Sequence, residues 1–143
     1  MTVSSLLQVK GRDVLTTTAD RTLGDAVAVL AEKRIGALVV VGGAGEVVGI
    51  ISERDVVRAL AKGGASILAD PVRAHMTAKV TTCSESTRVR DVMEIMTAGK
   101  FRHLPVVENG RLVGVVSIGD VVKERLTEAE NEAEAMRSYI HAA

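Results

Sequence analysis

The chain has 143 residues, of which 47% are hydrophobic, so it is long and apolar enough for one compact domain or two very small units that share a core. Its 18 basic residues balance its 18 acidic residues, and Phe101 and Tyr139 are its only aromatic residues. This composition argues against a general polyanion-binding surface and against base stacking with single-stranded nucleic acid, so we expect no nucleic-acid partner.

Membrane, export and metal-binding signals are also missing from the sequence. No apolar run approaches the roughly 18 residues of a membrane span, and the first residues lack the apolar core of a signal peptide. Cys83 is the one cysteine, and the three histidines, His75, His103 and His141, do not have metal-binding spacing. We therefore expect a cytoplasmic protein with no membrane association and no metal site.

The first predicted elements are a short strand at 14–16 and a helix with apolar residues at helical spacing, namely Leu23, Ala26, Val27 and Leu30. Thr22, with Asp25 three positions later, is a typical helix start. Two β-branched runs at 37–41 and 47–51 surround a glycine-rich turn and predict a hairpin. A helix at 53–62 follows, and the glycine-containing segment 63–70 is predicted to be a linker.

The same order of elements then returns. A strand is predicted at 80–82, a hairpin from the runs 104–107 and 112–116, and a closing helix at 119–126. Between the strand and the hairpin, a helix is predicted from the apolar residues Val89, Val92, Met93 and Met96. The second half of the chain therefore has the same predicted organisation as the first.

A direct comparison of the two halves identifies a tandem duplication. Displacing the chain by about 66 residues places Val14 on Val80 and Asp25 on Asp91, and the displacement becomes about 65 after the hairpin turn. One copy has too little core to be stable alone. We therefore predict an α/β fold of two β-α-β-β-α repeats, packed sheet against sheet with pseudo-two-fold symmetry.

Residues 127–143 are rich in Glu and Ala and predict a C-terminal helix. A thin apolar stripe runs along it, formed by Leu126, Ala129 or Ala133, Met136 and Ile140, and we expect this stripe to pack on a neighbour. The predicted organisation is a first repeat with its lead-in at 1–62, a linker at 63–75, a second repeat at 76–127 and a C-terminal helix at 128–143.

Two equivalent segments carry the strongest functional signal. GIISERD at 49–55 and GVVSIGD at 114–120 share the pattern Gly-hydrophobic-x-Ser-x-x-Asp. These segments resemble the nucleotide-binding signature of CBS domains, and Met76-Thr77 and the segment HLPVV at 103–107 resemble two further motifs of that family. The resemblance covers about residues 8–127 and implies a tandem CBS pair, or Bateman module, of the stand-alone bacterial type.

The chemistry of the motif can be stated from its residues. The glycine permits close approach of a ligand to a hairpin strand. Ser52 and Ser117 follow a strand and open a helix, where free N–H groups can hold a phosphate. Asp55 and Asp120 lie in the first helical turn and can accept hydrogen bonds from ribose hydroxyls. The same Ser-x-x-Asp spacing is also an ordinary helix cap, and both roles are compatible in one residue.

The resemblance implies two clefts, each built from both repeats. In one cleft, Ser117 and Asp120 work with Arg102 and His103. The base pocket of that cleft is lined by the backbone of Gly36, Ala37 and Leu38. In the other cleft, the signature residues Ser52, Arg54 and Asp55 work with the backbone of His103, Leu104 and Pro105.

Charged residues indicate that the two clefts differ. Gly119 stands where the first copy has Arg54, so the two clefts offer different charges. Arg102 is a better phosphate ligand than His103, because a guanidinium is charged at any pH. Lys10 and Arg12 precede the first strand, where family members place ligand-contacting residues. They can clamp the phosphates of ATP or NAD, or they can form a solvated loop of mixed charge.

The function implied by the resemblance is regulatory. The module binds an adenine nucleotide (AMP, ADP, ATP or NAD), forms an antiparallel disc-like homodimer to which the C-terminal helix contributes, and signals in trans to a separate protein. One alternative is a structural or dimerisation module without a nucleotide response. The other is an enzyme related to IMP dehydrogenase, but 143 residues leave no room for a catalytic barrel, so we expect no enzyme.

Overall fold

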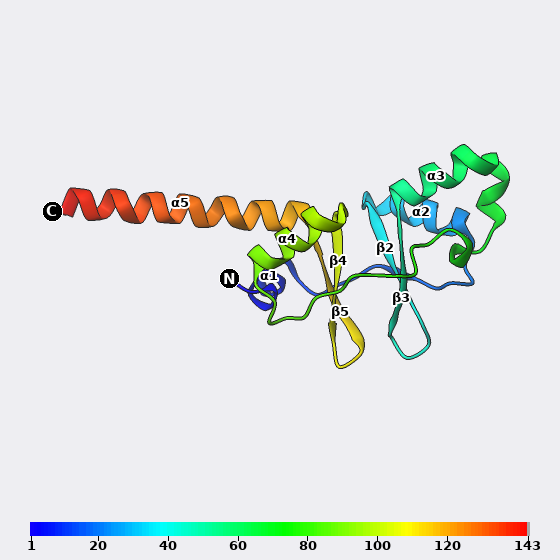
Figure 1. Cartoon of the computed structure of the whole chain (residues 1–143), viewed down its shortest axis with the longest axis horizontal. Helices are drawn as coiled ribbons and strands as arrows, with labels where there is room; N and C mark the ends of the chain where they lie inside the picture. The colour runs from blue at the N-terminus through cyan, green and yellow to red at the C-terminus, as the bar shows by residue number, and fades with distance from the viewer. Residues whose placement is uncertain (143) are drawn as a thin grey trace.

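Each repeat is centred on one antiparallel hairpin in the computed structural model, which describes residues 1–142 (Figure 1). In the first repeat, β2 (Ala37–Val41) pairs with β3 (Val47–Ser52), and β1 (Thr16–Thr17) adds a short parallel strand beside β2. In the second repeat, β4 (His103–Glu108) pairs with β5 (Arg111–Ser117). The predicted α/β class and both predicted hairpins are confirmed.

Helices cover these sheets as the apolar spacing predicted. The first repeat carries α2 (Leu23–Lys33) and α3 (Glu53–Gly63), and the second carries α4 (Val89–Gly99) and the start of α5 (Ile118–Ala142). The hydroxyl of Thr22 caps α2 by accepting from the N–H of Asp25. Both α2 and α4 end at a residue in the left-handed conformation, Arg34 and Lys100, about 66 positions apart, so the duplication extends to backbone detail.

Two hydrophobic clusters, one in each repeat, form the core. The first contains Leu23, Ala26, Leu30, Leu38, Val40, Ile51, Val56, Ala59, Ile67 and Val72. The second contains Val3, Leu6, Leu7, Cys83, Val89, Val92, Met96, Leu104, Val106, Val116 and Val121. Both clusters are built from alternate strand residues and one stripe of each helix, which is the expected pattern for sheet faces covered by helices.

The lead-in segments are exchanged between the repeats. Helix α1 (Val3–Lys10) precedes the first repeat in sequence, yet its Leu6 and Leu7 are buried in the second core. The equivalent segment before the second repeat, η2 (Val72–Ala74), buries Val72 in the first core. The preceding helical turns of η1 (Gly64–Ala69) also bury Ile67 in the first core. The segment 63–70, predicted from its glycines to be a plain linker, is therefore part of the first core.

The two signature glycines make this exchange possible. A Cβ placed on Gly114 would lie 2.9 Å from both methyl groups of Leu7, and one on Gly49 would lie 2.5 Å from the sulfur of Met76. Close approach of a ligand was the role predicted for these glycines from the sequence. In the structure they admit the exchanged segments, which is a packing role.

The predicted strand at 80–82 and the predicted division of the C-terminal helices differ from the structure. Residues 80–82 do not form a strand, and the chain there makes a single parallel bridge between Cys83 and Val106. The predicted helices at 119–126 and 127–143 form one continuous helix, α5, because no Gly or Pro interrupts the helix between residues 120 and 142. Ala143, the last residue of the second prediction, lies outside the described residues.

Within residues 1–142, no helix is long and apolar enough to cross a membrane. In the same range, no group of three or more His, Cys, Asp or Glu side chains is arranged to hold a metal ion.

Candidate functional site

A cleft of about 540 Å³ opens where β3 ends and α3 begins, which is in the size range of small-molecule sites. It is lined from both repeats. The first repeat contributes Gly36, Ile50, Ser52, Glu53, Arg54, Asp55 and Arg58, and the second repeat with its lead-in contributes Thr77, Lys79, Val80, Thr81, Gly99, Lys100, Phe101, Arg102 and His103. We call this the Ser52 cleft.

The signature serine and aspartate of this cleft form a reciprocal cap on α3. The backbone N–H of Ser52 donates to Asp55 Oδ2 at 2.9 Å, and the N–H of Asp55 donates to Ser52 Oγ at 3.3 Å. Thr77 Oγ1 lies 3.4 Å from the other carboxylate oxygen, Asp55 Oδ1. The capping interpretation is therefore correct for this pair, and it directs Oδ1 of Asp55 towards the segment from the second repeat.

Positive charge dominates the Ser52 cleft. Its lining includes five cationic side chains, Arg54, Arg58, Lys79, Lys100 and Arg102, but only two acidic ones, Glu53 and Asp55. The guanidinium of Arg54 also donates to the carbonyl oxygen of Lys100 at 3.3 Å, so it connects α3 with the end of α4. Together with the N-terminus of α3, these cations make the cleft an anion-binding environment.

A second constellation lies at the equivalent position in the second repeat. The N–H of Ser117 donates to Asp120 Oδ2 at 2.9 Å, and the N–H of Asp120 donates to Ser117 Oγ at 3.2 Å. Lys10 Nζ lies 2.5 Å from the same Oδ2 and 2.6 Å from the carbonyl oxygen of Val115. Lys10 therefore reaches the second signature aspartate from the lead-in of the first repeat.

The environment of Asp120 favours its ionised form. Burial alone would raise the pKa of this carboxyl group, but the hydrogen bond and charge of Lys10, together with the hydrogen bonds from Ser117, outweigh it. The net result is a pKa lowered from its ordinary value. Asp120 is thus a preformed carboxylate with a cation beside it.

His103 lies between the two constellations. Its imidazole packs against Gly36, where a Cβ would come within 3.1 Å of the ring. Burial lowers the pKa of His103, and the positive charge of Lys10 lowers it further, while Glu53 and Asp120 partly oppose these effects. His103 is therefore a neutral hydrogen-bonding group at neutral pH, in contrast to Arg102.

The structure divides the predicted site residues differently from the sequence analysis. Arg102 and Gly36, expected to serve the cleft of Ser117 and Asp120, line the Ser52 cleft. The side chains of Leu38 and Leu104 are fully buried in their own cores, and Ala37 pairs with Ser52 within the sheet. Leu38 and Leu104 can therefore offer a ligand backbone groups only.

The backbone carbonyl group of Pro105, which was expected to contact a ligand, already accepts a hydrogen bond within the chain. The amide N–H of Cys83 donates to its carbonyl oxygen at 3.0 Å.

Burial raises the pKa of the Cys83 thiol to about 11, so this cysteine is an inert core residue.

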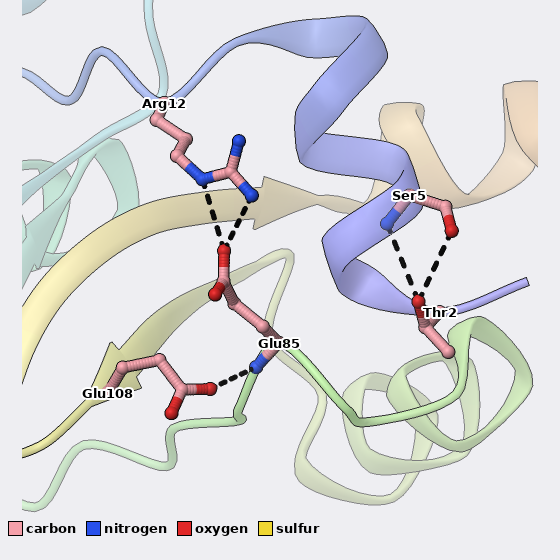
Figure 2. Close-up of polar contacts among 5 residues, drawn as sticks. All are labelled: Thr2, Ser5, Arg12, Glu85 and Glu108. Carbon is pink, nitrogen blue, oxygen red and sulfur yellow. Dashed lines mark hydrogen bonds and ion pairs between the residues drawn. The ribbon is translucent and has the colours of Figure 1, made fainter.

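Lys10 and Arg12 do not act as a pair. Figure 2 shows Arg12 turned towards Glu85, with Nε and Nη2 lying 3.0 Å and 2.7 Å from Glu85 Oε1. The N–H of Glu85 in turn donates to a carboxylate oxygen of Glu108 at 2.7 Å. Arg12 thus ties the first lead-in to the start of the second repeat, while Lys10 alone faces the signature residues.

Several residues of the Ser52 cleft were missed by the sequence analysis. Arg58 lies one helical turn after Arg54 on α3, and the i, i+4 spacing could have identified it. Lys79 and Lys100 follow no motif that was considered. Lys79 reaches the cleft because the exchanged segment crosses β3 through the bridge between Ile50 and Thr77.

The family of the chain follows from comparison with known proteins. The CBS domain model matches it twice, at residues 7–62 and 72–127, so the chain belongs to the CBS-domain family and is a tandem pair. It is 36% identical over 147 residues to the mitochondrial CBS domain-containing protein CBSX3 of Arabidopsis thaliana, covering 97% of this chain and 71% of that protein. The crystal structure of the CBS-domain containing protein ATU1752 from Agrobacterium tumefaciens matches with a TM-score of 0.84 and 49% identity, covering 87% of this chain and 99% of that chain.

Two other similar solved structures contain adenosine compounds. The CBS domain protein PAE2072 from Pyrobaculum aerophilum, complexed with AMP, matches with a TM-score of 0.77 and 29% identity over 89% of this chain and 99% of that chain. The CBS domain pair of protein MJ0100, in complex with 5-methylthioadenosine and S-adenosyl-L-methionine, matches with a TM-score of 0.78 and 27% identity over 91% and 98%.

One protein with a similar sequence is an enzyme. An inosine-5'-monophosphate dehydrogenase of Methanocaldococcus jannaschii is 32% identical over 115 residues. The match spans 80% of this chain and 22% of the dehydrogenase, so the likeness is confined to a small part of that enzyme.

Proposed function

We propose that the chain is a regulatory sensor that binds an adenine nucleotide and passes the signal to a separate protein. The observation that carries this proposal is the Ser52 cleft, where five cations surround the N-terminus of α3 and the Ser52–Asp55 cap. The complexes of PAE2072 with AMP and of MJ0100 with adenosine derivatives support the adenosine part of the proposal.

The charge of the cleft favours a ligand with phosphates. S-adenosyl-L-methionine carries a sulfonium cation, which the cations Arg54, Arg58 and Arg102 would repel, and 5-methylthioadenosine carries no phosphate for them to bind. AMP, ADP, ATP and NAD each carry negative charge that can lie against these side chains. Five cations are more than one phosphate needs, which favours ATP, ADP or NAD over AMP in this cleft.

The signature aspartate supplies a group for the ribose. Asp55 Oδ2 is occupied by the cap, whereas Oδ1 faces Thr77 at 3.4 Å, a long contact that a ribose hydroxyl can replace. Ile50 and Val80 provide apolar surface in the same cleft for a flat base. The adenosine would thus lie across the two repeats, so that binding changes how tightly they are held together.

Isothermal titration calorimetry with AMP, ADP, ATP, NAD and S-adenosyl-L-methionine tests the proposal, with GTP as the matched control for phosphate alone. For a ligand of about 23 non-hydrogen atoms at about 0.3 kcal/mol per atom, the expected dissociation constant is on the order of 10 μM. We expect ATP to bind more tightly than AMP in the Ser52 cleft. Absence of binding by every adenine nucleotide at millimolar concentration would instead favour the structural, ligand-independent module.

The proposed role is binding rather than catalysis. The described clefts contain capped carboxylates and cations, while Cys83 is buried with a raised pKa. The dehydrogenase likeness covers 22% of that enzyme's length. Incubation of ATP and NAD with the chain, followed by chromatography, is expected to return both nucleotides unchanged.

A further inference from the structure

Within the described residues 1–142, most of helix α5 packs against no other element. Val121 is buried in the second core, but beyond it the helix leaves the rest of the molecule and ends far from it (Figure 1). Leu126, Met136 and Ile140 are 59%, 63% and 65% exposed. A helix of 25 residues, about 37 Å long, is marginal in water when only its first turns are packed.

Six exposed apolar residues of α5 follow a heptad pattern. The separations alternate between four and three residues along Val122, Leu126, Ala129, Ala133, Met136 and Ile140. This alternation places all six side chains on one seam, which is the a and d pattern of a coiled coil, with Leu126, Ala133 and Ile140 at a. The seam is continuous from the point where α5 leaves the second core almost to the end of the helix.

We propose that this seam binds the α5 seam of a second copy of the chain, as a parallel, in-register, two-stranded coiled coil. The flanking charges identify the partner and its direction. In a parallel pair each g residue faces the partner's e residue five positions further on. Arg125 then faces the partner's Glu130, and Glu132 faces the partner's Arg137, so all four symmetry-related pairs have opposite charges.

The antiparallel arrangement with full overlap is disfavoured by the same residues. It places Glu130 against the partner's Glu130, Glu132 against the partner's Glu132, and Lys123 against the partner's Arg137. Sliding that pair by one heptad removes these repulsions but leaves part of the apolar seam uncovered. The pattern thus favours a parallel α5 pair over the antiparallel arrangement expected from the family resemblance.

Contacts within α5 do not compete strongly with this pairing. Arg125 forms an ion pair with Glu128 at 3.3 Å on the same helix, and the two side chains are partly exposed, at 49% and 34%. Exposed pairs of this kind are weak, so Arg125 can turn to a residue of the second copy at little cost. The small residues Ala129 and Ala133 at the centre of the seam allow the two helices to approach closely.

A charge-swap experiment on the full chain tests both the partner and the direction. Arg125→Glu is expected to raise the dimer dissociation constant about tenfold or more, because it opposes two pairs of carboxylates. Combining it with Glu130→Arg restores opposite charges and is expected to restore dimerisation. Analytical ultracentrifugation measures the constant, and circular dichroism checks the helix content. A monomeric parent chain, or a double variant no better than the single one, would overturn the proposal.

A disulfide experiment tests the register independently. In the parallel pair Met136 faces the partner's Met136, so Met136→Cys is expected to form a covalent dimer on oxidation. Glu134→Cys, on the outer face of the same turn, is the matched control and is expected to stay monomeric on a non-reducing gel. The native Cys83 is buried and does not interfere. Equal cross-linking of both variants, or of neither, would refute the in-register pairing, and nucleotide titration of the same variants tests the sensor function separately.

Discussion

Lys10 Nζ lies 2.5 Å from Asp120 Oδ2, which joins the lead-in of the first repeat to the first turn of α5. The lysine assigned to a phosphate and the aspartate assigned to a ribose are therefore partners of each other. The contact also ties α1 to the second repeat beside the apolar packing of Leu6 and Leu7. Any ligand of this second constellation must share Asp120 with Lys10.

This ion pair predicts an acid-dependent part of the stability. Because the pKa of Asp120 is lowered from its ordinary value of 3.8, the ionised form is favoured in the folded state. The contribution is present above pH 3.8 and is lost as the pH falls through the lower folded pKa. We expect Lys10→Met to reduce the free energy of unfolding, measured in urea, by less than about 1 kcal/mol near neutral pH. The difference from the parent should shrink below pH 3.8, and a difference independent of pH would contradict the ion pair.

If the two signature aspartates bind the ribose, replacing either of them should lower the affinity for adenine nucleotides. Asp55→Ala and Asp120→Ala are each expected to weaken adenine-nucleotide binding in their own cleft by about 1.5–3 kcal/mol, since hydrogen bonds to a charged group are lost. Each also removes a helix cap and is expected to cost about 0.5–2 kcal/mol of stability. Calorimetry and urea unfolding separate these two effects.

Asp25→Ala is the matched control for these variants. Asp25 occupies the same position in the first turn of α2 but does not line the Ser52 cleft, so nucleotide affinity should not change. Deoxyadenosine nucleotides should bind the parent chain more weakly than their ribo forms. If both aspartate variants bind as tightly as the parent, the ribose assignment is wrong.

The cations of the Ser52 cleft predict a dependence on phosphate number and on salt. Arg54→Ala and Arg102→Ala are each expected to weaken ATP binding more than AMP binding, and to reduce the salt dependence of the ATP affinity. Arg73→Ala is the control, because Arg73 pairs with Asp20 and does not line the cleft. Titrations at two salt concentrations that give the same ATP affinity for all three variants would refute the phosphate assignment.

The packing role of the signature glycines predicts a change in stability. Gly114→Ala places a methyl group 2.9 Å from Leu7 and is expected to destabilise the fold by about 1–3 kcal/mol. Gly43→Ala, in a turn where a Cβ meets nothing within 4 Å, is the control and should be close to neutral. If Gly114→Ala leaves the free energy of unfolding unchanged and weakens nucleotide binding, the result would contradict the packing role and favour close approach of a ligand.

Local signals in the sequence were sufficient for both hairpins, for the helices α2, α3 and α4, and for the caps at Thr22 and Ser52. Helical spacing identified the buried face of α2 through Leu23, Ala26 and Leu30, and the duplication identified equivalent elements without any structural information. The Ser-x-x-Asp spacing correctly placed Ser52 at the start of α3. These features depend on contacts between residues that are close in sequence.

Features that depend on distant contacts were not predictable in this way. Nothing in the sequence near Gly114 indicates that Leu7 packs against it, and the exposed-looking segment 63–70 gave no sign that Ile67 is buried. The same limit applies to Arg102, because its place in the lining of the Ser52 cleft depends on how the two repeats meet. Lys79 was missed because its place follows from the exchanged segment.

The exchange of α1 and η2 has a consequence for how such a chain can arise. Each lead-in packs in the core of the other repeat, so two separate single-repeat chains would have to trade lead-ins in order to form the same cores. Joining the copies in one chain replaces this concentration-dependent encounter with a fixed effective concentration. It also allows the two halves to differ within one molecule, as Arg54 and Gly119 do at matching positions.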